Sequence, residues 1–141
     1  MNATARTFCR YLACLAVLAG GLLHLQIWNS TYRKIPSGAV PGVWVVKDGF
    51  PVEAGLSVVV VLLLLFVRRH LVWVGAILFE LGAVLALVLS REASLFGWKE
   101  SGWGSDPKRV ILVEVVAVIA LALTLGFDFA HTDAENELAT L

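Results

Sequence analysis

A histidine and three glutamates lie within the apolar stretches of this sequence, and they are the side chains that could do chemistry. They are His24, Glu53, Glu80 and Glu114. A histidine and three carboxylates can exchange protons, accept hydrogen bonds from a ligand or coordinate a metal ion. Because an isolated charge in hydrocarbon is costly, an ionisable residue in such a stretch is a candidate for a functional site.

The apolar stretches that carry these residues have the length of membrane-spanning helices. Hydrophobic residues make up 59% of the 141 residues, and mean hydropathy is +0.83. A water-soluble chain of this size could not enclose that much apolar surface, whereas about 20 apolar residues cross a bilayer as a helix. The sequence therefore predicts an all-α, up-down-up-down bundle of four transmembrane helices in a single integral membrane domain. The expected spans are residues 7–28, 51–67, 71–90 and 108–127, followed by an acidic tail at 128–141.

The connections between the spans are unequal. Residues 29–50 and 91–107 form two long loops on one side, and residues 68–70 form a tight turn on the side of the termini. Pro51 is expected near the start of the second span, where proline is tolerated. The apolar residues 43–46 are too short to span, so we expect them to form an interfacial segment or a short strand.

The four ionisable residues should converge in the half of the bundle nearest the long loops. At a rise of about 1.5 Å per residue, His24 lies roughly 6 Å, Glu114 roughly 9 Å and Glu80 roughly 15 Å below the long-loop ends of their spans. Glu53 lies at the same end of its span. Small residues on the same helix faces favour inward placement. These are Ala13, Ala16, Gly20 and Gly21 with His24, Ala76 and Ala83 with Glu80, and Ala117 with Glu114.

Two interpretations of this cluster stay open at the level of sequence. In the structural one, buried carboxyl groups are protonated and hydrogen-bond to neighbouring helices, and the histidine is a packing residue. In the functional one, His24, Glu80 and Glu114 form a proton-handling or ligand-binding site that is reached from the long-loop side.

We expect neither a metal nor another cofactor. His24, Glu53 and Glu114 are suitable metal ligands by type, but no close-spaced pair supports a metal site. Haem is not expected, because the other two histidines, His70 and His131, lie at or beyond helix ends on the opposite side from His24.

The second long loop combines glycines with tryptophans. The glycines allow tight turns, and Trp98 and Trp103 are expected at the headgroup level. Alternatively, the loop is a lid whose Lys99 and Glu100 face the polar site. Arg33, in the first long loop, is a candidate for binding lipid phosphate.

Charge and cysteine content exclude other classes. Eleven basic and eleven acidic residues give a net charge of zero, so no basic face for nucleic acid is expected. The expected partners are the lipid bilayer and either further copies of the chain or a membrane partner subunit.

Cys9 and Cys14 lie about 140° apart around a helix, so their thiols should not pair.

We expect a plasma-membrane protein with cytoplasmic termini. Four lysine and arginine residues lie with the termini and the tight turn, and seven lie on the long-loop side, five within the loops and two, Lys108 and Arg109, directly after the second loop. The plain count favours the opposite orientation. The N-terminal Arg6 and Arg10 are undiluted by acidic residues, however, and the first helix usually dominates orientation.

His24, Tyr-Arg-Lys-Ile-Pro at 32–36, Leu-Phe-Gly-Trp-Lys-Glu-Ser-Gly at 95–102 and Glu114 together suggest a family. With these motifs the chain resembles small four-helix membrane proteins of actinobacteria, and more loosely DoxX-like four-helix proteins. The biochemical role of the first family is uncharacterised, so the resemblance implies an architecture and no activity.

Three functions fit these expectations, in decreasing order of preference. The first is a non-enzymatic bundle that binds lipid, a small ligand or a partner subunit through the polar site. The second is a small proton-coupled transporter, although small multidrug transporters carry their key Glu in the first span, where this chain has His24. The third is a redox or quinone-linked membrane enzyme, against which the lack of paired cysteines and haem ligands counts.

Overall fold

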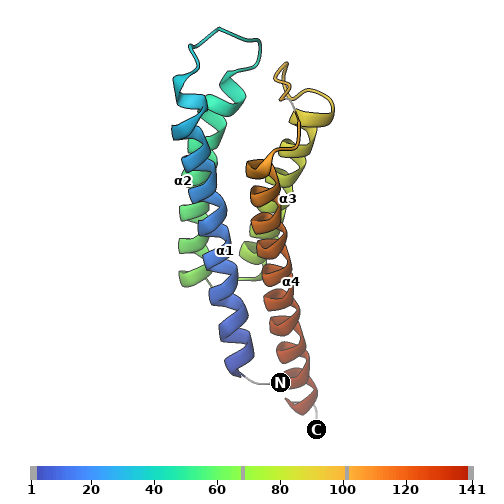
Figure 1. Cartoon of the computed structure of the whole chain (residues 1–141). Coiled ribbons are helices and arrows are strands. Elements are labelled where there is room, and N and C mark those ends of the chain that lie inside the picture. Colours follow the sequence, from blue (N-terminus) through green and yellow to red (C-terminus); the bar gives the residue numbers. More distant parts are fainter. Residues whose placement is uncertain (1–2, 68, 101, 140–141) are drawn as a thin grey trace.

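The computed structural model of the chain is a bundle of four long helices (Figure 1). It describes residues 3–67, 69–100 and 102–139, with side chains except at 3, 6 and 128–139. The helices are α1 (Ala3–Ser30), α2 (Trp44–Phe66), α3 (His70–Glu92) and α4 (Ser105–Ala139), and a single 3-10 turn, η1 (Tyr32–Lys34), follows α1. The described residues contain no strand, so the predicted all-α fold is confirmed.

All four helices can cross a membrane. In the described part of the chain, four helical segments are long and apolar enough to do so. Their outward faces carry large apolar side chains, among them Phe66 at 79% exposure and Leu71 at 80%. Apolar surface spread over every face of a bundle is unfavourable in water and favourable in lipid, so the structure is that of a multi-pass membrane protein.

The topology is up-down-up-down. Both long loops lie at one end of the bundle, and the termini and the α2–α3 connection lie at the other (Figure 1). α1 packs extensively on α2 and α4, and α3 packs on α4, whereas α2 and α3 contact each other less. The helix that carries His24 therefore lies against the helices that carry Glu53 and Glu114.

The half of the bundle nearest the termini has an apolar core. Its members include Ala13, Val17, Leu64, Trp73 and Leu121. At this end the guanidinium group of Arg10 donates hydrogen bonds to the Leu64 carbonyl, at 2.5 and 3.1 Å, and to the Leu65 carbonyl, at 2.5 Å. These carbonyls belong to the last turn of α2, where no further helical donor follows. Arg10 thus fastens α1 to the end of α2.

The expected start of the second span at Pro51 is wrong. α2 begins at Trp44 and contains Pro51, so residues 44–46 form its first turn and not a strand. Their expected position at the membrane interface stays a prediction. A proline inside a helix leaves the carbonyl four residues earlier without its N–H donor. Here that carbonyl belongs to Lys47, and it accepts a 2.7 Å hydrogen bond from the Trp28 indole nitrogen.

The two long loops pack on each other. Leu95 and Trp98 exchange backbone hydrogen bonds of 2.8 and 2.9 Å around a tight two-residue turn. Gly42, with φ +73°, lies so close that an added Cβ would clash with the Trp98 backbone nitrogen. The Trp98 side chain is only 7% exposed and meets Tyr32 edge to face at 6.1 Å. Trp98 is thus a packing residue between the loops, and its expected position at the headgroup level stays a prediction.

Two predicted segments reach beyond what the structure describes. α4 continues as a helix through the predicted tail to Ala139, but the side chains of 128–139 lie outside the described residues. The predicted tight turn includes position 68, which also lies outside them. The two cysteines are free, as expected.

Candidate functional site

Each helix contributes one ionisable side chain to a single cluster. The four-helix cluster consists of His24 from α1, Glu53 from α2, Glu80 from α3 and Glu114 from α4. His24, Glu80 and Glu114 are 4%, 1% and 0% exposed, and the Glu53 side chain is 16% exposed. The expected convergence of these residues is therefore present, while their function stays a prediction.

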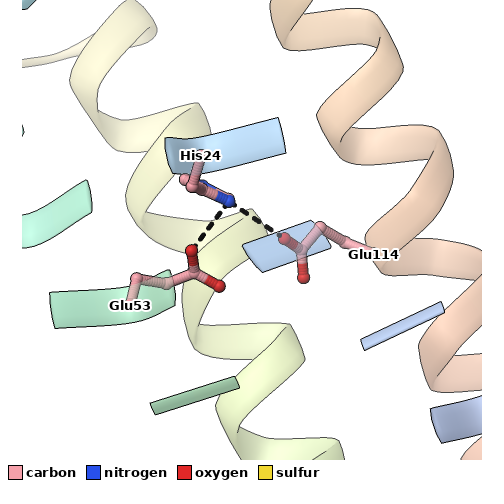
Figure 2. A group of neighbouring side chains, drawn as sticks. All are labelled: His24, Glu53 and Glu114. Carbon is pink, nitrogen blue, oxygen red and sulfur yellow. Dashed lines mark ion pairs between the residues drawn. The ribbon is translucent and has the colours of Figure 1, made fainter. Parts of the chain in front are cut away.

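The His24 imidazole lies between two carboxylates (Figure 2). Its Nδ1 atom is 2.8 Å from Glu53 Oε2 and 3.7 Å from Glu114 Oε1. The same nitrogen is 3.0 Å from the Gly20 carbonyl oxygen, one helical turn earlier in α1. Phe50 meets the imidazole edge to face, at 4.9 Å between ring centroids. The ring is thus held in place by α1 and α2 with Nδ1 directed at the carboxylates.

Small residues on α1 make room for the cluster. A Cβ added to Gly20 would lie 3.1 Å from Glu114 Oε1, and one added to Gly21 would lie 2.8 Å from the Ser57 Cβ. The glycines therefore let α4 and α2 approach α1 closely enough for Glu114 and Glu53 to reach His24. Ser57 Oγ donates to the Glu53 carbonyl at 3.0 Å and lies 3.3 Å from Glu53 Oε1.

The carboxyl group of Glu80 completes the cluster from α3. It lies within hydrogen-bonding reach of the Glu114 carboxyl group. Two ionised carboxylates at this separation would repel each other strongly, because the helix interior has a low dielectric constant.

The cluster has an excess of acceptors over donors. Both carboxylate oxygens of Glu114 are buried without a hydrogen-bond partner among the described residues, and Glu53 Oε2 has His24 Nδ1, at 2.8 Å, as its ion-pair partner. Within the same residues, the ion pairs of these carboxylates involve only His24, and no lysine or arginine. A single imidazole cannot balance three carboxylates, so the cluster requires protons or a cation from outside the chain.

Two cavities connect the cluster with the long-loop side. One, of about 190 Å³, is lined by His24, Phe50, Arg91, Glu100 and the start of α4. The other, of about 180 Å³, lies between α2 and α3 and reaches both His24 and Glu53. The cavities therefore border His24 and Glu53 from the long-loop side, whereas Glu80 and Glu114 lie beyond their lining.

Glu100 is the predicted loop residue that the structure brings to the site. It lines both cavities, and its Oε2 is 2.8 Å from the Arg91 guanidinium group. Burial raises the pKa of the Glu100 carboxyl above its ordinary value. Lys99, which was expected to face the site with Glu100, is exposed and lines neither cavity.

Arg33 lies away from the cluster. It is exposed, its Nη1 donates to Asn29 Oδ1 at 3.2 Å, and its guanidinium group lies 5.6 Å from the Trp28 ring centroid. This position is compatible with the predicted contact to lipid phosphate, which stays a prediction.

The sequence did not reveal every residue of the site. Ser57 lies four residues after Glu53, so helical spacing could have placed it beside that carboxylate. Phe50 could not be found in this way, because the expected helix began after it. Arg91 was visible as a basic residue at the end of a span, but its partner Glu100 depends on how the loop folds back.

Three of the cluster residues also have the arrangement of metal ligands. One ligand atom each from His24, Glu53 and Glu114 can be chosen so that all three atoms lie within 4.8 Å of one another. The sequence offered no close-spaced ligand pair because these residues come from three different helices.

Comparisons with protein-family models, with curated proteins and with solved structures found no match. The resemblance to actinobacterial four-helix proteins therefore stays a prediction, and the function has to be argued from the cluster itself.

Proposed function

We propose that this multi-pass membrane protein binds a small cation in the four-helix cluster. The observation that carries the proposal is a cluster of three carboxylates from three helices with one imidazole, in which Glu80 and Glu114 are fully buried and Glu53 is largely buried, with no lysine or arginine of the described residues paired to them. Acceptors without donors in a low-dielectric interior favour a ligand that brings positive charge.

The size of the cavities limits the ligand. Volumes of about 190 and 180 Å³ suit a metal ion with its water ligands or a small organic ammonium ion. They are smaller than the sites that usually enclose drug-sized ligands. The carboxylates at the inner end and Glu100 near the outer end would attract a cation along the same route.

Access from one side supports binding over transport. Both cavities lie in the long-loop half, whereas the other half is filled by the apolar core around Val17, Leu64 and Leu121. A transporter would have to open that core to release its ligand on the side of the termini. The bundle is therefore better suited to holding a cation than to carrying it across, and proton-coupled transport is the second candidate.

We further place the protein in the plasma membrane with its termini in the cytoplasm, so that the cation enters from outside the cell. This orientation follows from the basic residues of α1. Reporter fusions at the C-terminus, one active only in the cytoplasm and one only outside it, measure the orientation directly.

Binding can be tested on the purified protein in lipid nanodiscs. The unfolding temperature and the heat of binding would be measured with methylammonium, Mg²⁺, Ca²⁺, Mn²⁺ and Zn²⁺. We expect at least one of these cations to bind saturably to the wild type, and its binding to be lost in Glu53→Gln and Glu114→Gln. Glu92→Gln is the matched control, because Glu92 is an exposed carboxylate in α3 outside the cluster. Binding of every cation equally to wild type and both cluster variants, or no binding at all, would contradict the proposal.

A further inference from the structure

We infer that the cation of the four-helix cluster is a divalent first-row transition metal ion, held by His24 Nδ1 and by the carboxylates of Glu53 and Glu114. This inference rests on the proposed function and names the class of ligand. It is carried by the three-helix donor set and by buried carboxylate oxygens that no donor in the described residues satisfies.

The donor atoms nearly have the separations that a metal requires. In a tetrahedral zinc site with ligand bonds of about 2.0–2.2 Å, the ligand atoms lie about 3.3–3.6 Å apart. Here His24 Nδ1 is 2.8 Å from Glu53 Oε2 and 3.7 Å from Glu114 Oε1. Small rotations of the two glutamate side chains would therefore bring all three atoms to a common ion.

The unsatisfied atoms point to a ligand. Glu114 is fully buried, yet neither of its carboxylate oxygens has a hydrogen-bond partner among the described residues, and the only charged contact of Glu53 Oε2 there is His24 Nδ1 at 2.8 Å. A buried acceptor without a partner is destabilising, because the loss of its hydration is not compensated. Coordination would satisfy these oxygens. The Gly20 carbonyl would lose its contact with His24 Nδ1, but as a helical carbonyl it still accepts the backbone N–H of residue 24.

Neighbouring residues would orient the ligands. Ser57 Oγ lies 3.3 Å from Glu53 Oε1, which leaves Oε2 directed at His24. Glu80, within hydrogen-bonding reach of Glu114 on the neighbouring helix, limits the positions that the Glu114 carboxylate can take. Such outer hydrogen bonds fix the orientation of metal-binding carboxylates.

The chemistry of the donors selects the type of metal. An imidazole nitrogen beside two carboxylates suits Mn²⁺, Fe²⁺ or Zn²⁺ better than Mg²⁺ or Ca²⁺, which prefer oxygen ligands alone. Thiolate, which selects softer ions, is not part of the cluster, because Cys14 belongs to the apolar core. A neutral imidazole and two carboxylates also balance a 2+ charge, and water from the adjoining cavities can fill the remaining coordination positions.

The test uses the full chain in nanodiscs after removal of metal with a chelator. Calorimetry would be run with Zn²⁺ and with Mn²⁺, and bound metal would be counted by elemental analysis. We expect one ion per chain, with the affinity reduced at least a hundredfold in His24→Gln and in Glu114→Gln. Ser57→Ala should reduce it about 10–100-fold, as loss of an orienting hydrogen bond does in other metal sites. The exposed control Glu92→Gln should bind like wild type, and circular dichroism without metal would show that each variant is folded.

X-ray absorption of the zinc-loaded protein provides a readout that a purely structural role would not affect. We expect one imidazole in a shell that is otherwise oxygen, and loss of the imidazole signal in His24→Gln. Zinc with no imidazole ligand, or zinc affinity unchanged in both His24→Gln and Glu114→Gln, would overturn the inference.

The two proposals can fail separately. If methylammonium binds in a Glu114-dependent way while Zn²⁺ and Mn²⁺ do not bind, the metal inference is wrong and the proposed cation site stands. If no cation binds to folded protein, both are wrong.

Discussion

The indole nitrogen of Trp28 donates a 2.7 Å hydrogen bond to the carbonyl oxygen of Lys47. Pro51, four residues after Lys47, has no N–H with which to satisfy that carbonyl. A side chain of α1 therefore replaces the missing backbone donor of α2. With this carbonyl satisfied, α2 continues through Pro51. Phe50 and Glu53 therefore reach His24 from one continuous helix.

A double-mutant cycle tests this relationship. Trp28→Phe alone should lower the free energy of unfolding by about 1 kcal/mol, because the Lys47 carbonyl loses the indole donor. In a Pro51→Ala background the same change should cost less, since alanine at that position supplies the helical N–H. Unfolding would be followed by circular dichroism in detergent. An equal cost in both backgrounds would mean that Trp28 stabilises the bundle by packing alone.

Gly21 sets the distance between α1 and α2. An added Cβ would lie 2.8 Å from the Ser57 Cβ and 3.4 Å from the Ala54 Cα, so Gly21→Ala should force the helices apart. We expect Gly21→Ala to lower the free energy of unfolding, measured by thermal denaturation, by about 1–3 kcal/mol. Gly82→Ala is the control, because nothing lies within 4 Å of a Cβ at that helical position. The control should be neutral or stabilising by about 0.5–1 kcal/mol.

The contact between the long loops depends on Gly42. Gly42 and Gly38 both have positive φ, at +73° and +84°, but only Gly42 lies against the backbone of Trp98. Alanine at either position destabilises the fold by about 1–2 kcal/mol, because a residue with a Cβ disfavours positive φ. At Gly42 the added Cβ must also push the two loops apart. Gly42→Ala should therefore shift Trp98 fluorescence to the red and speed proteolysis of the loops, while Gly38→Ala should leave both unchanged. Identical behaviour of the two variants would contradict the close approach.

Glu100 should control how fast a cation enters. Its carboxylate lines both cavities and pairs with Arg91. Arg91 and Asp106 line the cavity of about 190 Å³. Glu100→Gln leaves the positive charge of Arg91 unbalanced at the entrance, so stopped-flow measurements should show slower association of Zn²⁺, more so at low salt. Lys99→Gln, an exposed change beside it, should have little effect.

The same residue gives the entrance a pH dependence. Because burial raises the pKa of Glu100, its negative charge is present above that pKa and is lost as the pH falls through it. Association should therefore slow at a higher pH than an ordinary glutamate would cause. This pH dependence of the association rate should be missing in Glu100→Gln. If it persists in that variant, it belongs to another titrating group.

The sequence predicted the number of spans, the topology and the end of the bundle where polar groups meet. Hydropathy and helix rise suffice for these because a bilayer imposes helices of known length. The start of α2 could not be predicted, since Pro51 marks a helix boundary unless a donor from elsewhere replaces the lost hydrogen bond. That donor, Trp28, lies on another helix and is recognisable only after folding.

The cluster was predictable in outline but not in detail. Depth placed His24 and Glu114 at similar levels, and small residues indicated inward faces. Depth does not give rotation or tilt, however, so the 2.8 Å approach of His24 to Glu53 could not be derived. The burial of Trp98 between the loops could not be derived either, because the sequence does not reveal that Gly42 allows the two loops to meet around it.

The account depends most on one claim, that a cation occupies the four-helix cluster. A hydrophobic carbodiimide reacts with protonated carboxyl groups in apolar surroundings, and mass spectrometry locates the adduct. In the metal-free protein we predict labelling of Glu80 and Glu114, and strong protection of both by the tightest-binding cation of the series, with exposed Glu92 as the internal reference. Labelling of Glu80 and Glu114 that no cation of the series reduces would contradict the account.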